Sequence, residues 1–87
     1  MIAITFDTRN HGDRMIDSSK NLDWTSDPPN SNFPEDMYSM MLGNVQDVQL
    51  LIDMIPVYLN ISNICWGIVG MSLGAHSALL TIANGKY

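Results

Sequence analysis

Ser72 lies between Gly70 and Gly74 in the stretch GMSLG, which fits the pattern G-x-S-x-G. In that pattern a tight turn from a strand into a helix pushes the serine Oγ clear of the backbone, and only small neighbours fit the turn. The backbone N–H of Leu73, at the N-terminus of such a helix, can donate to a developing oxyanion. The residues predict an acyl-transfer nucleophile with Ser72 at positive φ. The alternative is an ordinary turn with Ser72 as a helix N-cap.

Two short apolar runs predict the strands that such a turn requires. They are IAITF, residues 2–6, and ISNICWGIV, residues 61–69. Both are typical of strands covered on two faces, as in parallel sheets. The polar stretch 7–14 predicts a loop after the first strand, and residues 15–33 predict an irregular insertion because Asp27-Pro28-Pro29-Asn30 breaks regular structure.

Two helices are predicted beside these strands. Asn32, followed by Pro34 and Glu35, marks a helix start, and Pro56 is expected to end or kink that helix. Residues 73–83 predict a second, buried helix, capped at its C-terminus by the pair at 84–85. The alternating order predicts one α/β layer over residues 1–87, with parallel strands and a crossover helix. The first helix carries an apolar stripe at Met37, Met41, Val45, Val48, Ile52 and Ile55.

Composition and charge narrow the class of protein. The chain has 87 residues and a net charge of −5, without a basic cluster that would bind nucleic acid. Polar residues interrupt the apolar runs too often for a membrane span. Cys65, the single cysteine, lies in an apolar run and is expected to be a buried thiol in a reducing compartment. No signal peptide is visible, so we expect a cytoplasmic protein.

Two motifs, taken in order, resemble the α/β-hydrolase superfamily. FDTRNHG, residues 6–12, resembles the F-D-x-R-G-H-G segment after the fourth strand of that family, and GMSLGAH, residues 70–76, resembles its nucleophile elbow. Residues 35–53 also resemble the intervening helix of an uncharacterised fungal branch. Asn10 departs from the pattern, because the family has glycine there. The resemblance implies a partial α/β-hydrolase fold, from the fourth strand to the helix after the elbow.

The same resemblance implies a role for each matched residue. The family's acid and histidine follow the serine, and its second oxyanion donor precedes residue 1, so the isolated chain is expected to be an inactive segment of a serine hydrolase. A complete domain would act on a small ester, thioester or amide. The matched residues are Ser72 as nucleophile, Leu73 as oxyanion donor, Gly70 and Gly74 in the elbow, and Asp7, Arg9, His11 and Gly12 in a structural loop.

The histidines are the remaining candidates for a base. The loop of His11 is expected at the same sheet edge as Ser72, with Asp7 or Asp13 to orient it, although a structural role fits it better. His76 lies one helical turn after Ser72 and favours a packing or surface hydrogen bond. No metal-ligand spacing and no cofactor motif are present. The second hypothesis is a non-catalytic remnant or small interaction protein, whose exposed strand edges would self-associate.

Overall fold

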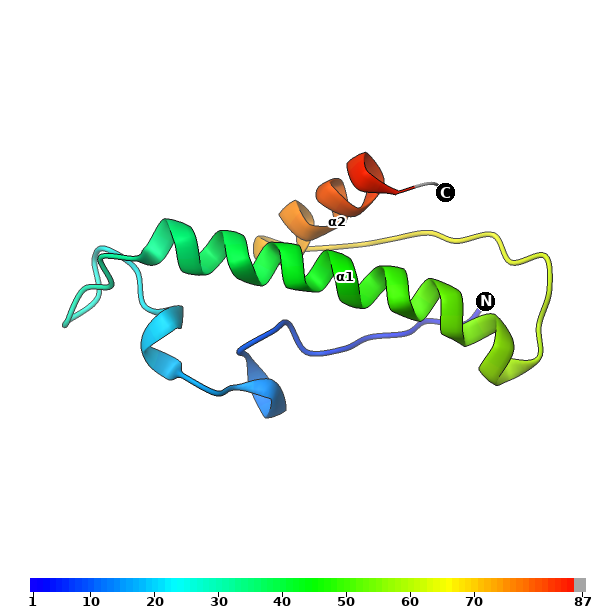
Figure 1. Ribbon diagram of the computed structural model, residues 1–87, viewed down its shortest axis with the longest axis horizontal. Helices are drawn as coiled ribbons and strands as arrows, with labels where there is room; N and C mark the ends of the chain where they lie inside the picture. The colour runs from blue at the N-terminus through cyan, green and yellow to red at the C-terminus, as the bar shows by residue number, and fades with distance from the viewer. Residues whose placement is uncertain (86–87) are drawn as a thin grey trace. The chain divides into compact units, whose positions relative to one another are not determined.

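The structure, a computed structural model, describes residues 1–85 and is helical throughout its regular parts (Figure 1). Two short 3-10 helices, η1 (Gly12–Arg14) and η2 (Ser18–Asn21), precede two α-helices, α1 (Phe33–Leu59) and α2 (Leu73–Asn84). The chain divides into two compact units, Met1–Met40 and Met41–Tyr87. The boundary between the units falls inside α1.

The prediction of an α/β layer is wrong, because residues 1–85 form no strand. The segments 2–6 and 61–69 follow extended paths in Figure 1, but neither forms a strand within residues 1–85. No backbone hydrogen bond joins residues 2–6 or 62–70 to any other residue that the structure describes. A strand exists only when a neighbouring strand takes up its N–H and C=O groups. Apolar, β-branched composition made these segments fit for a sheet, and the described chain contains no partner for them.

Helix α1 begins close to the expected position. Asn32 is the last residue before the helix, and the backbone N–H of Asp36 donates to its carbonyl oxygen at 2.9 Å. Pro34 near the helix start has no N–H to leave unpaired, and the acidic residues of the first turn interact favourably with the helix dipole. These are local effects, so the sequence was sufficient to locate the helix start.

Of the two expectations for Pro56, the one that it ends α1 is wrong, and the one that it kinks the helix stays a prediction. Pro56 lies inside the helix, which continues to Leu59. Asn60 then adopts a left-handed conformation at φ 53°, and the N–H of Ile61 donates to the carbonyl of Pro56 at 3.0 Å. This closing turn is the usual way in which a helix ends on a residue tolerant of positive φ. Asn60, rather than Pro56, therefore terminates the helix.

Helices α1 and α2 meet in the second unit through small polar side chains. The Nδ2 group of Asn44 donates to the Oγ of Ser77 at 3.1 Å, and Ser77 Oγ donates to the carbonyl of Leu73 at 3.0 Å. Thr81 Oγ1 donates to the carbonyl of Ser77 at 2.8 Å. Asn44, Ser77 and Thr81 are only 3–5% exposed, so this crossing is buried, and each polar side chain in it is hydrogen-bonded.

The apolar core is very small. Met40 in the first unit and Val45 in the second are the buried hydrophobic side chains of the described chain. Val45 belongs to the predicted stripe of α1, and the other stripe residues are half-buried, which confirms which face of the helix is covered. Helix α2 was expected to be buried, but Leu79 and Ile82 on it are 67% and 65% exposed. Most apolar side chains of both units therefore remain in contact with water.

Candidate functional site

The turn before α2 is the most constrained backbone of the second unit. Ser72 has φ 55° and ψ −118°, which confirms the predicted positive φ. This combination is rare for a residue with a side chain and persists only where its surroundings enforce it. A Cβ on Gly70 would collide with the backbone carbonyl of Gly74, whereas a Cβ on Gly74 would meet nothing within 4 Å. The close approach therefore requires glycine at position 70 and leaves position 74 free.

The Ser72 side chain is not a helix cap. Its Oγ makes no capping hydrogen bond to α2, and the residue is exposed. The carbonyl of Ser72 accepts instead, from the N–H of Ala75 at 3.0 Å and from the N–H of His76 at 3.2 Å. Ser72 thus occupies the N-cap position of α2, as the alternative interpretation expects, but its side chain does not cap the helix. Leu73 is the first residue of α2, where backbone N–H groups have no partner within the helix.

Neither histidine bonds to the Ser72 hydroxyl. The Nδ1–H of His76 donates to the carbonyl of Ser72 at 3.1 Å, an exposed contact that leaves the lone pair of a neutral ring on Nε2. His11 belongs to the first unit, and its Nδ1–H donates to the carbonyl of Arg9 at 3.0 Å. Among the residues that the structure describes, no hydrogen bond links a base to Ser72.

The loop after residue 6 is organised by Asp7 in the first unit. Asp7 Oδ2 accepts from the N–H of Asp13 at 3.0 Å, and its backbone carbonyl accepts from Arg14 Nη1 at 2.8 Å. Gly12 lies in the left-handed region at φ 55°, and a Cβ there would collide with the Asp7 carboxylate. Glycine at position 12 is therefore favoured by its backbone conformation, and a Cβ there would also displace the Asp7 carboxylate.

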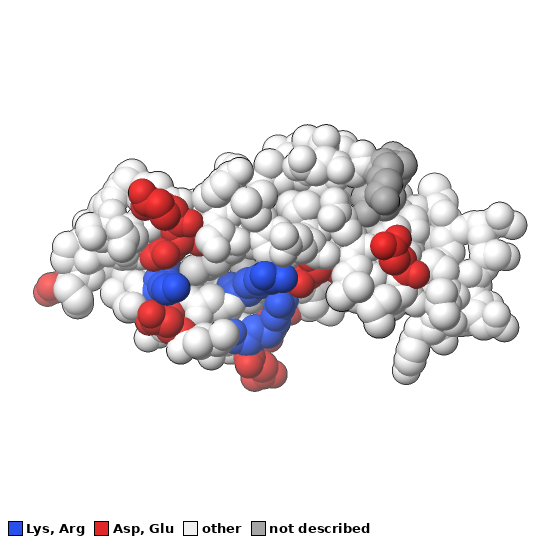
Figure 2. Space-filling view, viewed as in Figure 1, with Lys and Arg blue, Asp and Glu red and all other residues white. Residues whose placement is uncertain are grey.

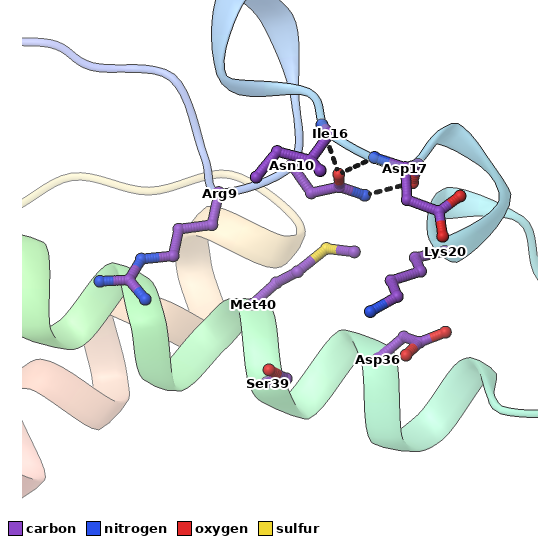
Figure 3. Close-up of a pocket in the computed structure, with 8 residues that line it drawn as sticks. All are labelled: Arg9, Asn10, Ile16, Asp17, Lys20, Asp36, Ser39 and Met40. Atoms are coloured by element: carbon purple, nitrogen blue, oxygen red, sulfur yellow. Dashed lines mark hydrogen bonds between the residues drawn. The ribbon is translucent and has the colours of Figure 1, made fainter.

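Asn10 is the hub of the same loop, a role that the sequence did not suggest. Its Oδ1 accepts from the N–H groups of Ile16 and Asp17, each at 2.9 Å (Figure 3). Its Nδ2 donates to the Asp17 carbonyl at 2.7 Å and to Asn21 Oδ1 at 2.9 Å, and Asn21 Nδ2 donates to the Asn10 carbonyl at 2.8 Å. Asn10 has φ 62°, a conformation that asparagine adopts more readily than most residues. The preference of asparagine for this conformation was the one feature of the sequence that could have pointed to the role of Asn10.

A hollow of about 250 Å³ lies between this loop and the start of α1 in the first unit (Figure 3). Two cationic side chains, Arg9 and Lys20, and two anionic side chains, Asp17 and Asp36, line this hollow, so their formal charges cancel. Hydrogen bonds from the side chain and the backbone N–H of Ser19 hold the pKa of Asp17 below its ordinary 3.8. The lining residues are Arg9, Asn10, Ile16, Asp17, Lys20, Asp36, Ser39 and Met40.

Charges of both signs are also present on the surface of the protein. Figure 2 shows Lys and Arg side chains gathered on one part of the visible face, with Asp and Glu side chains around them. Three of the four Lys and Arg residues of the sequence are Arg9, Arg14 and Lys20. Mixed charges of this kind favour small polar molecules over the apolar chain of an acyl substrate. The hollow therefore does not supply an acyl pocket.

Trp24, Phe33, Tyr38 and Cys65 do not line this hollow. Trp24 packs edge-to-face on Phe33, with ring centroids 5.4 Å apart, and Tyr38 is exposed. Cys65 is an exposed free cysteine, so the expectation of a buried thiol is wrong. The reason is that its apolar run has no sheet to enter. No helix within residues 1–85 combines the length and the hydrophobicity that crossing a bilayer demands.

Comparison with known proteins gives no relative. No protein-family model, curated protein or solved structure matches the chain. The resemblance to the α/β-hydrolase superfamily and to its fungal branch is therefore wrong, since that fold is built on parallel strands and residues 1–85 contain none. The description of the chain as hydrolase-like is wrong as well, because it depended on that resemblance. What remains is the local geometry of the Ser72 turn and an unusually exposed apolar surface.

Proposed function

We propose that the chain is a small interaction protein whose exposed apolar surface is covered by another polypeptide, and that it performs no catalysis alone. The supporting observation is the exposure of large apolar side chains in the second unit. Tyr58 on α1 is 82% exposed, and Val69 and Met71 before α2 are 99% and 86% exposed. Large apolar side chains left this exposed are typical of a surface that another protein covers.

Charge supports the same proposal. All nine acidic residues lie at or before Asp53, and residues 54–85 contain no Asp, Glu, Lys or Arg. Charged side chains hinder an apolar segment from docking on another chain, and residues 54–85 lack Asp, Glu, Lys and Arg. A cytoplasmic location accompanies the proposal, supported by a single cysteine that leaves no pair for an internal disulfide.

The isolated chain is expected to associate. With Met40 and Val45 as its buried apolar side chains, it lacks the core that a cooperatively folded monomer of this size needs. Sedimentation velocity should show species heavier than a monomer at micromolar concentration, and heating should give a broad loss of helical circular dichroism. A monodisperse monomer with a sharp melting transition would contradict the proposal.

A second candidate function rests on one specific observation, the backbone of Ser72. With φ 55° and ψ −118°, an uncapped exposed hydroxyl, and the N–H of Leu73 beside it, the turn has the arrangement of a serine nucleophile for acyl transfer. A base is then required from outside the described residues. In this candidate function the polypeptide that covers the apolar surface also supplies the base.

Fluorophosphonate labelling tests this candidate. Without a base, which contributes about 10²–10⁴-fold when positioned, the isolated chain should label at Ser72 no faster than at exposed Ser62. Added imidazole should then accelerate labelling at Ser72 more than at Ser62, because only Ser72 has an oxyanion donor nearby. The adduct is located by peptide mass spectrometry, with Ser72→Ala as the blank. Equal acceleration at both serines would remove Ser72 as a nucleophile.

A further inference from the structure

We infer that the partner is a second copy of this chain, and that residues 64–69 of each copy pair as an intermolecular strand. The inference rests on the proposed interaction function and names both the segment and the occupant. It concerns ICWGIV, which lies between Asn63, with φ 59°, and the turn at Ser72. Figure 1 shows this part of the chain as an extended segment leading into α2.

The backbone groups of this segment favour an extended strand as the binding partner. None of residues 62–70 makes a backbone hydrogen bond to another residue that the structure describes. A run of unpaired N–H and C=O groups on an extended chain is a template for another extended chain, which takes up both kinds of group at once. An apolar helix or a lipid surface would cover the side chains and leave these backbone groups unpaired.

The side chains make self-pairing favourable. Six consecutive residues rich in β-branched and aromatic side chains, without charge or proline, are typical of segments that pair with themselves. The nearest charged residue in the sequence that the structure describes is Asp53, so the segment itself brings no like charges together when two copies pair. Natural edge strands are usually protected by lysine or proline, and this segment has neither.

One alignment also fits the sizes of the residues. In an antiparallel pair centred between positions 66 and 67, Trp66 of each copy lies opposite Gly67 of the other. A Cβ added to Gly67 would meet nothing within 4 Å, so the space over this glycine is open. Trp66 is 38% exposed and available to cover it. An aromatic residue opposite a glycine is a stabilising cross-strand pair.

Hydrogen exchange and a matched pair of lysine variants test the inference. In the wild-type chain the amides of residues 64–69 should gain protection as protein concentration rises, in step with the sedimenting mass. Ile68→Lys should raise the concentration needed for association by roughly tenfold or more, because burying an unpaired ammonium group is costly. Ile82→Lys, at a 65% exposed position on α2, should associate like the wild type. Far-ultraviolet circular dichroism checks that both variants keep their helices.

The outcomes separate this inference from the proposed function. Association without protection of residues 64–69, or equal loss of association in both variants, overturns the strand pairing and leaves an interaction protein that docks through its helices. Protection that does not change with concentration overturns it too, because the pairing would then lie within one chain. A chain that stays monomeric at every concentration overturns the inference, and only if it also melts sharply does it contradict the proposed function. The exchange experiment on the wild type decides the matter even if Ile68→Lys fails to fold.

Discussion

Gly70→Ala is expected to disrupt the first turn of α2 and to destabilise the second unit by about 3 kcal/mol, at the upper end of the usual cost of overpacking. The new Cβ would collide with the carbonyl of Gly74 and lie 2.7 Å from the backbone nitrogen of Ala75. These are backbone atoms of a helix, so no flexible side chain can move aside. Hydrogen exchange of the α2 amides and urea unfolding followed by circular dichroism measure the loss.

Two other glycines provide matched controls for this variant. Gly67→Ala adds the same methyl group where nothing lies within 4 Å, and it should leave the α2 amides unchanged. Gly74→Ala adds it within α2, also in open space, and should stabilise the helix by about 0.5–1 kcal/mol through propensity alone. If Gly70→Ala proved as harmless as Gly67→Ala, the close approach that holds Ser72 at positive φ would not exist.

Asn10→Ala is expected to unfold the loop of residues 9–21, at a cost of roughly 3 kcal/mol. The variant loses four side-chain hydrogen bonds, each with a net contribution of about 0.5–1.5 kcal/mol but weaker where exposed, and puts alanine at φ 62°. Because the first unit buries only one hydrophobic side chain, Met40, little else holds this loop. The amides of Ile16 and Asp17, which donate to Asn10 Oδ1, should lose their exchange protection first.

Asn10→Gly separates the two causes. Glycine accepts the left-handed backbone without strain but restores none of the side-chain hydrogen bonds. The amides of Ile16 and Asp17 should therefore remain unprotected in Asn10→Gly, although the loss of stability should be smaller than in Asn10→Ala. Full protection in Asn10→Gly would mean that the backbone conformation, and not the hydrogen-bonded side chain, organises the loop.

Local features were predictable from the sequence because they depend on residues close together in the chain. The start of α1 follows from Asn32 and Pro34, α2 extends from Leu73 to within one residue of the expected end, and Ser72 has the expected positive φ. Each of these depends on capping, periodicity or glycine placement within a few positions. The candidate nucleophile turn could therefore be located without any knowledge of the fold.

Features that need a distant partner were not predictable. Residues 2–6 and 64–69 have the composition of strands, but a strand also requires a neighbour, and composition does not say whether one is present. The exposure of Cys65 follows from the same missing neighbour. Asn10 stands where the resembled pattern has glycine, although its amide group makes four hydrogen bonds that glycine cannot make. The sequence gives the residue type of Asn10, but it does not show which residues, up to 11 positions away, this side chain hydrogen-bonds.

The hydrogen bond between Asn44 and Ser77 also decides which alignment of two helices is allowed. Apolar surfaces alone would let α2 slide along α1 with little change in energy. Moving α2 by one turn would bury the Asn44 amide without its acceptor, and an unsatisfied buried polar group costs about 1–3 kcal/mol. A contact that adds little net stability thus selects one register among several, as single buried polar residues do in coiled coils. In a unit with so few buried apolar side chains, this hydrogen bond contributes to the specificity of helix pairing.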